Sequence, residues 1–202
     1  SWEAFTDAFE ELKSLTGPGT FQQFLREGSQ TAREREAAAF FANIVQETGT
    51  GKWNSGLYHI VETCAASGSP NGNCVGYGSS APHYYYGRGP MQLSWDYNYE
   101  AFSQSYYGSK ALLINNPSIL QNDAKVAWLA AMWFWNRVDP SWSNPPPAIH
   151  DVMVNAKSYR GSTGFGGTIK AINGGLECPS SGNSKAQRRV SFYGSMQAVL
   201  GL

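Results

Sequence analysis

The sequence predicts a mainly α-helical protein with one long irregular segment, from about residue 48 to residue 90. On both sides of that segment apolar residues recur every three or four positions, which is the spacing of amphipathic helices. Within it the helical period gives way to Gly, Ser, Asn, Tyr and Pro, and long irregular segments in compact proteins are usually functional or disordered. Its many aromatic residues favour order, with at most short strands. No repeat or low-complexity linker is present, so we expect one domain over residues 1–202.

The N-terminal part is expected to form three helices. Apolar residues repeat from Trp2 to Leu15, and the sequence TGPG then ends the first helix. A short second helix is expected at residues 21–25. The third covers TAREREAAAFFANIVQE, in which Thr31 is followed three residues later by Glu34. That spacing is typical of a capping box at the start of a helix.

Helices are predicted again after the irregular segment, the first at about 94–106. The stretch DAKVAWLAAMWFWNRV is apolar around most of its circumference, which predicts a central buried helix. The proline-rich SNPPPAIHDVM leads into a short helix. GFGGTIKAINGG is expected to form another helix that its glycines stop, and SKAQRRVSFYGSMQAVLGL forms the last one.

The composition favours a neutral, polar ligand. Fifteen basic residues balance fifteen acidic ones, so no long-range attraction for nucleic acid or an anionic membrane is expected. No run of 18 apolar residues occurs, so no membrane span is predicted. Aromatic residues make up 14% of the chain, and with Asn and Ser they suit a carbohydrate. The alternative is that most of these rings belong to the core.

The three cysteines are Cys64, Cys74 and Cys178. The first two enclose AASGSPNGN, a run of small, turn-forming residues that favours a disulfide, and a disulfide implies an oxidising compartment. Cys178 is then left over, and we expect it to be a buried, unpaired thiol. His59 and His83 form no ligand cluster with the cysteines, so neither a metal nor another cofactor is expected.

The N-terminus gives no targeting signal. The chain begins SWEAFTDAF, without an initiator Met and without the basic stretch and apolar block of a signal peptide. We therefore expect a processed chain and a secreted protein whose signal peptide has been removed.

Glu47 is a carboxylate on the apolar side of a helix. Helical intervals back from it reach Ile44, Asn43 and Phe40, which places Glu47 at the rim of the apolar side, in the last helical turn. Partial desolvation and the negative end of the helix both favour the protonated form. A carboxylic acid that stays protonated is what a general acid needs. The alternative is that Glu47 caps a neighbouring backbone.

Glu62, in LYHIVETC, is a second carboxylate, and it lies two residues before Cys64. A disulfide at that cysteine would hold it in place. One carboxylate on a helix and one on a loop suit glycoside hydrolysis, in which one group protonates the leaving oxygen and the other activates water. The alternative is a solvated surface acid.

Several motifs occur in order along the chain: AAAFFANIVQETGTGKW, YYYGRGPMQLSWDYNYEAF, AMWFWNRV, HDVM, IKAINGGLEC and RRVSFY. Together they resemble the plant-type chitinases, glycoside hydrolase family 19, over nearly the whole chain. The resemblance implies a lysozyme-like, two-lobed helical fold. Gln46 stands where the family has His. The short spacing between Glu47 and Glu62 and the lack of Trp in the cysteine loop suggest a compact member with fewer sugar subsites.

The resemblance also implies a role for each matched position. Glu47 matches the general acid and Glu62 the general base of an inverting enzyme, whose two carboxyl groups stand about 6.5–9.5 Å apart. Ser94, with Gln92 nearby, matches the residue that holds the attacking water. The remaining matches comprise sugar contacts and an ion pair behind the acid. The sugar contacts are Tyr97, Asn98 and Asn173, the ion pair is Glu177 with Arg189, and we add Trp53 and Tyr86 as further aromatic contacts.

We therefore predict a monomeric, endo-acting, inverting chitinase whose partner is chitin or its oligosaccharides. A peptidoglycan muramidase is one alternative, because the lysozyme-like architecture serves both reactions. A non-catalytic chitin-binding defence protein is another. The presence of both Glu47 and Glu62 argues against the second alternative. Antifungal defence, cell-wall turnover and nutrition are all compatible roles.

Overall fold

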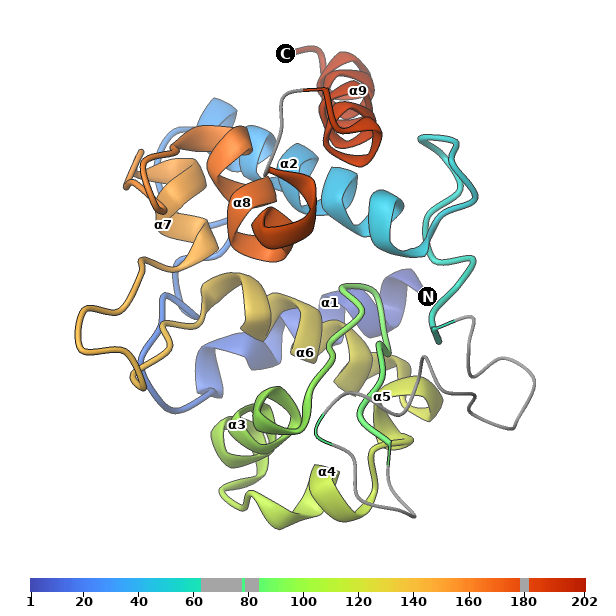
Figure 1. Ribbon diagram of the computed structural model, residues 1–202, viewed down its shortest axis with the longest axis vertical. Coiled ribbons are helices and arrows are strands. Elements are labelled where there is room, and N and C mark those ends of the chain that lie inside the picture. The colour runs from blue at the N-terminus through green and yellow to red at the C-terminus, as the bar shows by residue number, and fades with distance from the viewer. Residues whose placement is uncertain (63–77, 79–83, 179–181) are drawn as a thin grey trace. The chain divides into compact units, whose positions relative to one another are not determined.

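The computed structural model describes residues 1–62, 78, 84–178 and 182–202 (Figure 1). The predicted disulfide between Cys64 and Cys74 lies outside these residues. The chain divides into two compact units, one formed by Ser1–Gly17 with Leu57–Phe134 and the other by Pro18–Gly56 with Trp135–Leu202. Both units are built from helices, so the mainly α fold class is confirmed. In the described part of the chain, no helix has the length and apolar character needed to cross a membrane.

The first unit packs its helices around aromatic side chains. The ring of Phe5 on the first helix meets Trp128 edge to face, with 5.1 Å between ring centroids, and Phe102 packs on Trp133 at 5.5 Å. Asp123 caps the buried helix by accepting a hydrogen bond from the amide of Val126. The elements are α1 (Trp2–Glu11), η1 (Leu12–Ser14), α3 (Asp96–Tyr107), α4 (Ala111–Asn115), α5 (Ile119–Asn122) and α6 (Ala124–Asn136), the last continuing into the second unit.

Arg88 organises the described part of the irregular segment. Its guanidinium donates to Gln121 at 3.0 Å and to the hydroxyl of Tyr99 at 2.8 Å, and it lies 3.7 Å from the ring centre of Tyr86. Arg88 is only 4% exposed. Its backbone forms isolated bridges with Val61 and Leu93, so the expectation of at most short strands is confirmed for the described residues.

The second unit is centred on α2 (Gln30–Thr48), which contacts α7 (Ile149–Val154), α8 (Gly164–Glu177) and α9 (Ser184–Leu200) (Figure 1). Ala42 and Val45 of α2 are buried together with Phe192 of α9. The ring of Phe40 meets Trp135 edge to face at 5.4 Å.

Two predictions were wrong, one about residues 21–25 and one about the residue that caps α2. Residues 21–25 form turns and not a helix, because Leu25 has φ = 54°, which a right-handed helix does not allow. The carboxylate of Glu36 accepts a hydrogen bond from the Leu25 amide at 2.9 Å and fixes that turn. The helix is capped by Ser29, whose hydroxyl accepts from the amide of Ala32, so Thr31 lies inside the helix and is not its cap.

The end of α8 also differs from the prediction. The helix continues through its glycines to Glu177, with a kink at Asn173, where φ is −144°. Cys178 is the residue after the last turn, where it is exposed and unpaired rather than buried. It lies beyond the buried face of α8, to which Glu177 contributes.

A histidine between two carboxylates lies in the core of the second unit. His150 is fully buried, with Nδ1 2.6 Å from Glu36 Oε1 and Nε2 2.8 Å from Glu27 Oε2. The indole of Trp135 donates to the same Glu36 oxygen at 3.0 Å. Burial alone would lower the pKa of His150, but the hydrogen bonds and charges of Glu36 and Glu27 outweigh it and raise the pKa above 6.5.

The raised pKa of His150 predicts a loss of stability at alkaline pH. Its stabilising effect is fully present below about pH 6.5, where the unfolded chain also binds the proton, and is lost as the pH rises through the folded-state pKa. We expect the free energy of unfolding in urea to fall over that range, and the fall to be smaller in His150→Gln. His59→Gln, at a histidine outside this network, is the control. Equal slopes for the wild type and His150→Gln would contradict the prediction.

Candidate active site

Glu47 lies in the last turn of α2, one residue before the helix ends at Thr48. Its side chain is 20% exposed, so the carboxylate lies at the rim of the buried face. One of its oxygens, Oε1, accepts a hydrogen bond from Nη2 of Arg189. The carboxylate is therefore partly buried and has one fixed cationic partner.

Arg189 of α9 connects Glu47 to a second acid. Its Nε and Nη2 each donate at 2.8 Å to a different oxygen of Glu177, a bidentate geometry that fixes both side chains. Its Nη1 donates at 3.0 Å to Oδ1 of Asn43, one turn before Glu47 on α2. Arg189 is 1% exposed and Glu177 is 2% exposed, so this ion pair is fully buried.

One guanidinium charge is thus shared between two carboxylates. Burial raises the pKa of Glu177, but the hydrogen bonds and charge of Arg189 outweigh it, so the pKa lies below its ordinary value. Glu177 therefore carries a negative charge that offsets Arg189. The guanidinium of Arg189 therefore bonds both to the ionised Glu177 and to Glu47.

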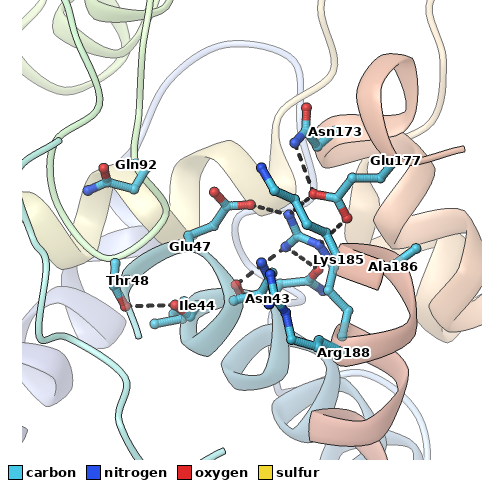
Figure 2. A network of polar contacts seen from close by, with 12 residues as sticks. Asn43, Ile44, Glu47, Thr48, Gln92, Asn173, Glu177, Lys185, Ala186 and Arg188 are labelled. Atoms are coloured by element: carbon cyan, nitrogen blue, oxygen red, sulfur yellow. Dashed lines mark hydrogen bonds and ion pairs between the residues drawn. The ribbon is translucent and has the colours of Figure 1, made fainter. Parts of the chain in front are cut away.

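Two further predicted residues lie beside this network. Asn173, at the kink of α8, donates through Nδ2 to Glu177 Oε1 at 2.9 Å (Figure 2). Gln46 accepts from Nε of Arg188 at 3.3 Å. In this structure Asn173 supports the buried acid, and its role as a sugar contact stays a prediction. Trp53, in the loop after α2, is 41% exposed.

Glu62 belongs to the first unit and is held by backbone contacts. Its amide donates to the carbonyl of Gly87 at 2.9 Å, and its Oε2 accepts from the Gly87 amide at 2.9 Å. The carboxylate is therefore positioned by the main chain of the YYYGRGP stretch. The predicted base is therefore hydrogen-bonded to Gly87, the residue directly before Arg88.

The structure explains why glycine occupies position 87 in the GRGP sequence. A side chain at this position would come within 2.8 Å of Oε1 of Gln92. Pro90 lies in a turn, and α3 begins only at Asp96. The close approach that the structure shows is to Gln92, whose Nε2 donates to the carbonyl of Gly89 at 3.1 Å.

Ser94 and Asn98 form the next part of this unit. The hydroxyl of Ser94 donates to the carbonyl of Gln92 at 2.9 Å, so toward a water molecule its oxygen acts as an acceptor. Asn98 donates through Nδ2 to the carbonyl of Ser94 at 2.7 Å. Its Oδ1 is buried and has no hydrogen-bond partner among the described residues, and a buried acceptor without a donor is unusual in folded proteins.

The predicted aromatic contacts differ in exposure. Tyr97 is 52% exposed, which suits a sugar contact. Tyr86 is 8% exposed, and its ring packs against Arg88. The burial of Tyr86 makes packing its evident role here.

Sequence reasoning placed Asn43 on the same helix face as Glu47 but predicted no role for it. It is fully buried, donates to Thr168 at 3.2 Å and accepts from Arg189. The available signal was an asparagine four residues before Glu47 in an otherwise apolar run, because positions four apart share a helix face. Among the described residues, no group of three or more His, Cys, Asp and Glu side chains is arranged to hold a metal ion.

The fold and the placed residues define the class of protein. The chain is helical, and its predicted acid and base each lie in one of two compact units, as in a glycosidase of lysozyme-like fold. The chain belongs to the class I chitinase family, glycoside hydrolase family 19, whose family model matches residues 6–202.

Individual relatives agree with this assignment. Endochitinase 2 of Gossypium hirsutum is 35% identical over 91% of this chain and 63% of its own length, and endochitinase CH25 of Brassica napus is 35% identical over the whole chain and 62% of its own length. The chain thus spans less than two thirds of these relatives.

Solved structures show the same fold. A bacterial family 19 chitinase is 35% identical, with a TM-score of 0.72 over all of this chain and 87% of that one. Chitinase C from Streptomyces griseus is 32% identical, with a TM-score of 0.72 over all of this chain and 70% of that one.

Proposed function

We propose that this chain is an endo-acting glycoside hydrolase that cleaves β-1,4-linked N-acetylglucosamine polymers with inversion at the anomeric carbon. The observation that carries the proposal is the network of Glu47, Arg189 and Glu177, because it holds a carboxylate at a helix end with a cation it shares with a second acid. Family membership and the endochitinase names of the relatives support the substrate.

Glu47 is the general acid. It gives its proton to the glycosidic oxygen as the bond from that oxygen to the anomeric carbon breaks. The carboxylate that remains is stabilised by the Arg189 guanidinium, which already donates to it. Glu177 accepts from the same guanidinium and so holds Arg189 beside Glu47.

Glu62 is the general base. It takes a proton from a water molecule, whose oxygen bonds to the anomeric carbon on the face opposite the leaving group. The Gly87 amide holds one oxygen of this carboxylate. The Ser94 oxygen accepts a hydrogen bond from the same water, and the buried Oδ1 of Asn98 accepts one from a donor group of the sugar.

The experiment that tests the proposal follows the anomeric form of the first product by NMR, with N-acetylglucosamine oligomers as substrate. Initial release of the α-anomer is expected, because a single displacement inverts the β-linkage. Initial β-anomer would contradict the mechanism. If the protein hydrolyses peptidoglycan and does not hydrolyse these oligomers, the proposed substrate is wrong and a muramidase is favoured.

Replacing Glu62 with glutamine is expected to lower kcat on the same oligomers by about 10²–10⁴-fold, because an amide cannot accept the proton of water. Glu100→Gln is the matched control, since Glu100 is an exposed acid of the same unit that pairs with Lys110 on the surface. A Glu62→Gln enzyme with the kcat of Glu100→Gln would show that another group is the base.

Secretion, a monomeric state and the disulfide between Cys64 and Cys74 stay predictions. Their support is the composition and the cysteine spacing of the sequence.

A further inference from the structure

Asn43 is a fully buried amide on α2, one turn before Glu47 (Figure 2). A buried amide lowers stability unless its polar atoms are hydrogen-bonded. Its Nδ2 donates to the carbonyl of Ala39 at 2.9 Å and to Oγ1 of Thr168 at 3.2 Å, and its Oδ1 accepts from Nη1 of Arg189 at 3.0 Å. The reversed amide would place its oxygen against the Ala39 carbonyl and its N–H groups against the guanidinium. The amide is therefore held in one orientation.

Asn43 is one of three residues that hold the guanidinium of Arg189. The five N–H groups of a guanidinium form a rigid plane. Nε and Nη2 bond to Glu177, and Nη2 also bonds to Glu47. Nη1 donates to Asn43 twice, to Oδ1 at 3.0 Å and to the backbone carbonyl at 3.4 Å. Because the group is rigid, a rotation that breaks the contacts with Asn43 also moves the N–H group that bonds to Glu47.

Thr168 of α8 holds the other end of the Asn43 amide. Its hydroxyl donates to the carbonyl of Phe165 at 2.8 Å, so its oxygen acts as an acceptor toward Nδ2 of Asn43. A chain of hydrogen bonds thus connects α8 to Glu47 through Asn43 and Arg189. Thr168 and Asn43 have no exposed surface, so neither side chain can contact a substrate in this structure.

We propose that Asn43 and Thr168 are positioning residues for the general acid: they act through Arg189, whose guanidinium they hold in the orientation that places Nη2 against Glu47. This inference rests on the function proposed above. A displacement of about 1 Å in an active site can lower a rate about 10²-fold, so breaking this chain of hydrogen bonds should lower kcat. KM should stay the same, because both side chains are enclosed by protein.

The test measures kcat and KM on N-acetylglucosamine hexamers for Thr168→Val and Thr168→Ser. Valine keeps the shape of the side chain without the hydroxyl, whereas serine keeps the hydroxyl. We expect kcat of Thr168→Val to fall by about 10–100-fold with KM unchanged, and Thr168→Ser to keep the kcat of the wild type. If Thr168→Val does not fold, Thr168→Ala, which also lacks the hydroxyl, takes its place.

Two results of this comparison would overturn the inference. One is a wild-type kcat in the variant without the hydroxyl. The other is an equal loss of kcat in Thr168→Ser, since the hydroxyl would then not be the group that matters.

A double variant tests whether Thr168 acts through Asn43. Residues of one hydrogen-bond network do not have additive effects. We therefore expect Asn43→Ala with Thr168→Val to have the kcat of Asn43→Ala alone. If the two losses multiply, the residues act independently and the proposed chain of contacts is wrong.

The matched control is Thr20→Val. Thr20 belongs to the same unit, and its hydroxyl donates to Oδ1 of Asn136 at 3.0 Å, so this variant loses a similar hydrogen bond elsewhere and should keep its kcat. A loss of kcat as large as that of Thr168→Val would overturn the inference, because a general loss of stability would explain both. These outcomes, with an active wild type, leave the proposed function intact. A wild type that does not hydrolyse the hexamer would instead overturn the proposed function.

Discussion

Replacing Glu47 with glutamine is expected to lower kcat on N-acetylglucosamine oligomers by about 10²–10⁴-fold, the usual contribution of a general acid. The amide keeps an oxygen that can accept from Arg189, but it has no proton acidic enough to protonate the leaving oxygen. Binding should therefore persist. The checks are kcat from steady-state kinetics and the dissociation constant for the oligomer from calorimetry.

Glu34→Gln is the matched control for this variant. Glu34 is on the same helix as Glu47 and makes an exposed side-chain hydrogen bond with Gln30, so its kcat should equal that of the wild type. If Glu47→Gln hydrolyses oligomers as fast as Glu34→Gln, another residue supplies the proton. If Glu47→Gln loses binding as well as turnover, the carboxylate holds substrate rather than transferring a proton.

The longer helices could be predicted from the sequence because their apolar residues repeat over several turns. This holds for the helix that begins at Trp2, for α2, for α6 and for α9. α4 (Ala111–Asn115) and α5 (Ile119–Asn122) were not predicted, since helices of five and four residues are too short to show a period. The kink at Asn173 was not predicted, because the glycines after it were expected to end the helix. In the structure α8 continues through these glycines to Glu177.

The candidate site was predictable only in part from the residues themselves. The position of Glu47 at a helix end follows from the pattern of α2. Arg189, which donates to it, is 142 residues away along the chain, and no local pattern connects the two. The resemblance to the family indicated the pair of Arg189 and Glu177, but not the additional contact of Arg189 with Asn43, because that contact depends on how α9 packs against α2.

Glu36 is a second example of a contact that sequence reasoning could not find. It ends the charged stretch that precedes the apolar run of α2. Such a residue would ordinarily be read as a solvated acid, yet Glu36 is fully buried. Its partner His150 is 114 residues away. Together with Trp135 and the Leu25 amide, the histidine supplies this carboxylate with donors from three other parts of the second unit.

Replacing Glu36 with leucine is expected to lower the free energy of unfolding by about 3–5 kcal/mol, the usual cost of removing one partner from a buried charged pair. The change leaves the indole of Trp135 and the amide of Leu25 without their acceptor, and it leaves His150 with Glu27 as its charged partner. Since about 1 kcal/mol corresponds to about 2–4 °C in Tm for a chain of this size, thermal unfolding followed by circular dichroism should show a decrease of about 10 °C.

Glu34→Leu, two residues away on the same helix, is the control for Glu36→Leu, and its Tm should change little because its side chain bonds only at the surface. The pH dependence provides an independent check. Glu36 raises the pKa of His150, so its removal should bring that pKa closer to the value in the unfolded chain. The loss of stability above pH 6.5 should then be smaller in Glu36→Leu than in the wild type. A leucine variant as stable as Glu34→Leu, with an unchanged pH slope, would show that the network contributes nothing to the folded state.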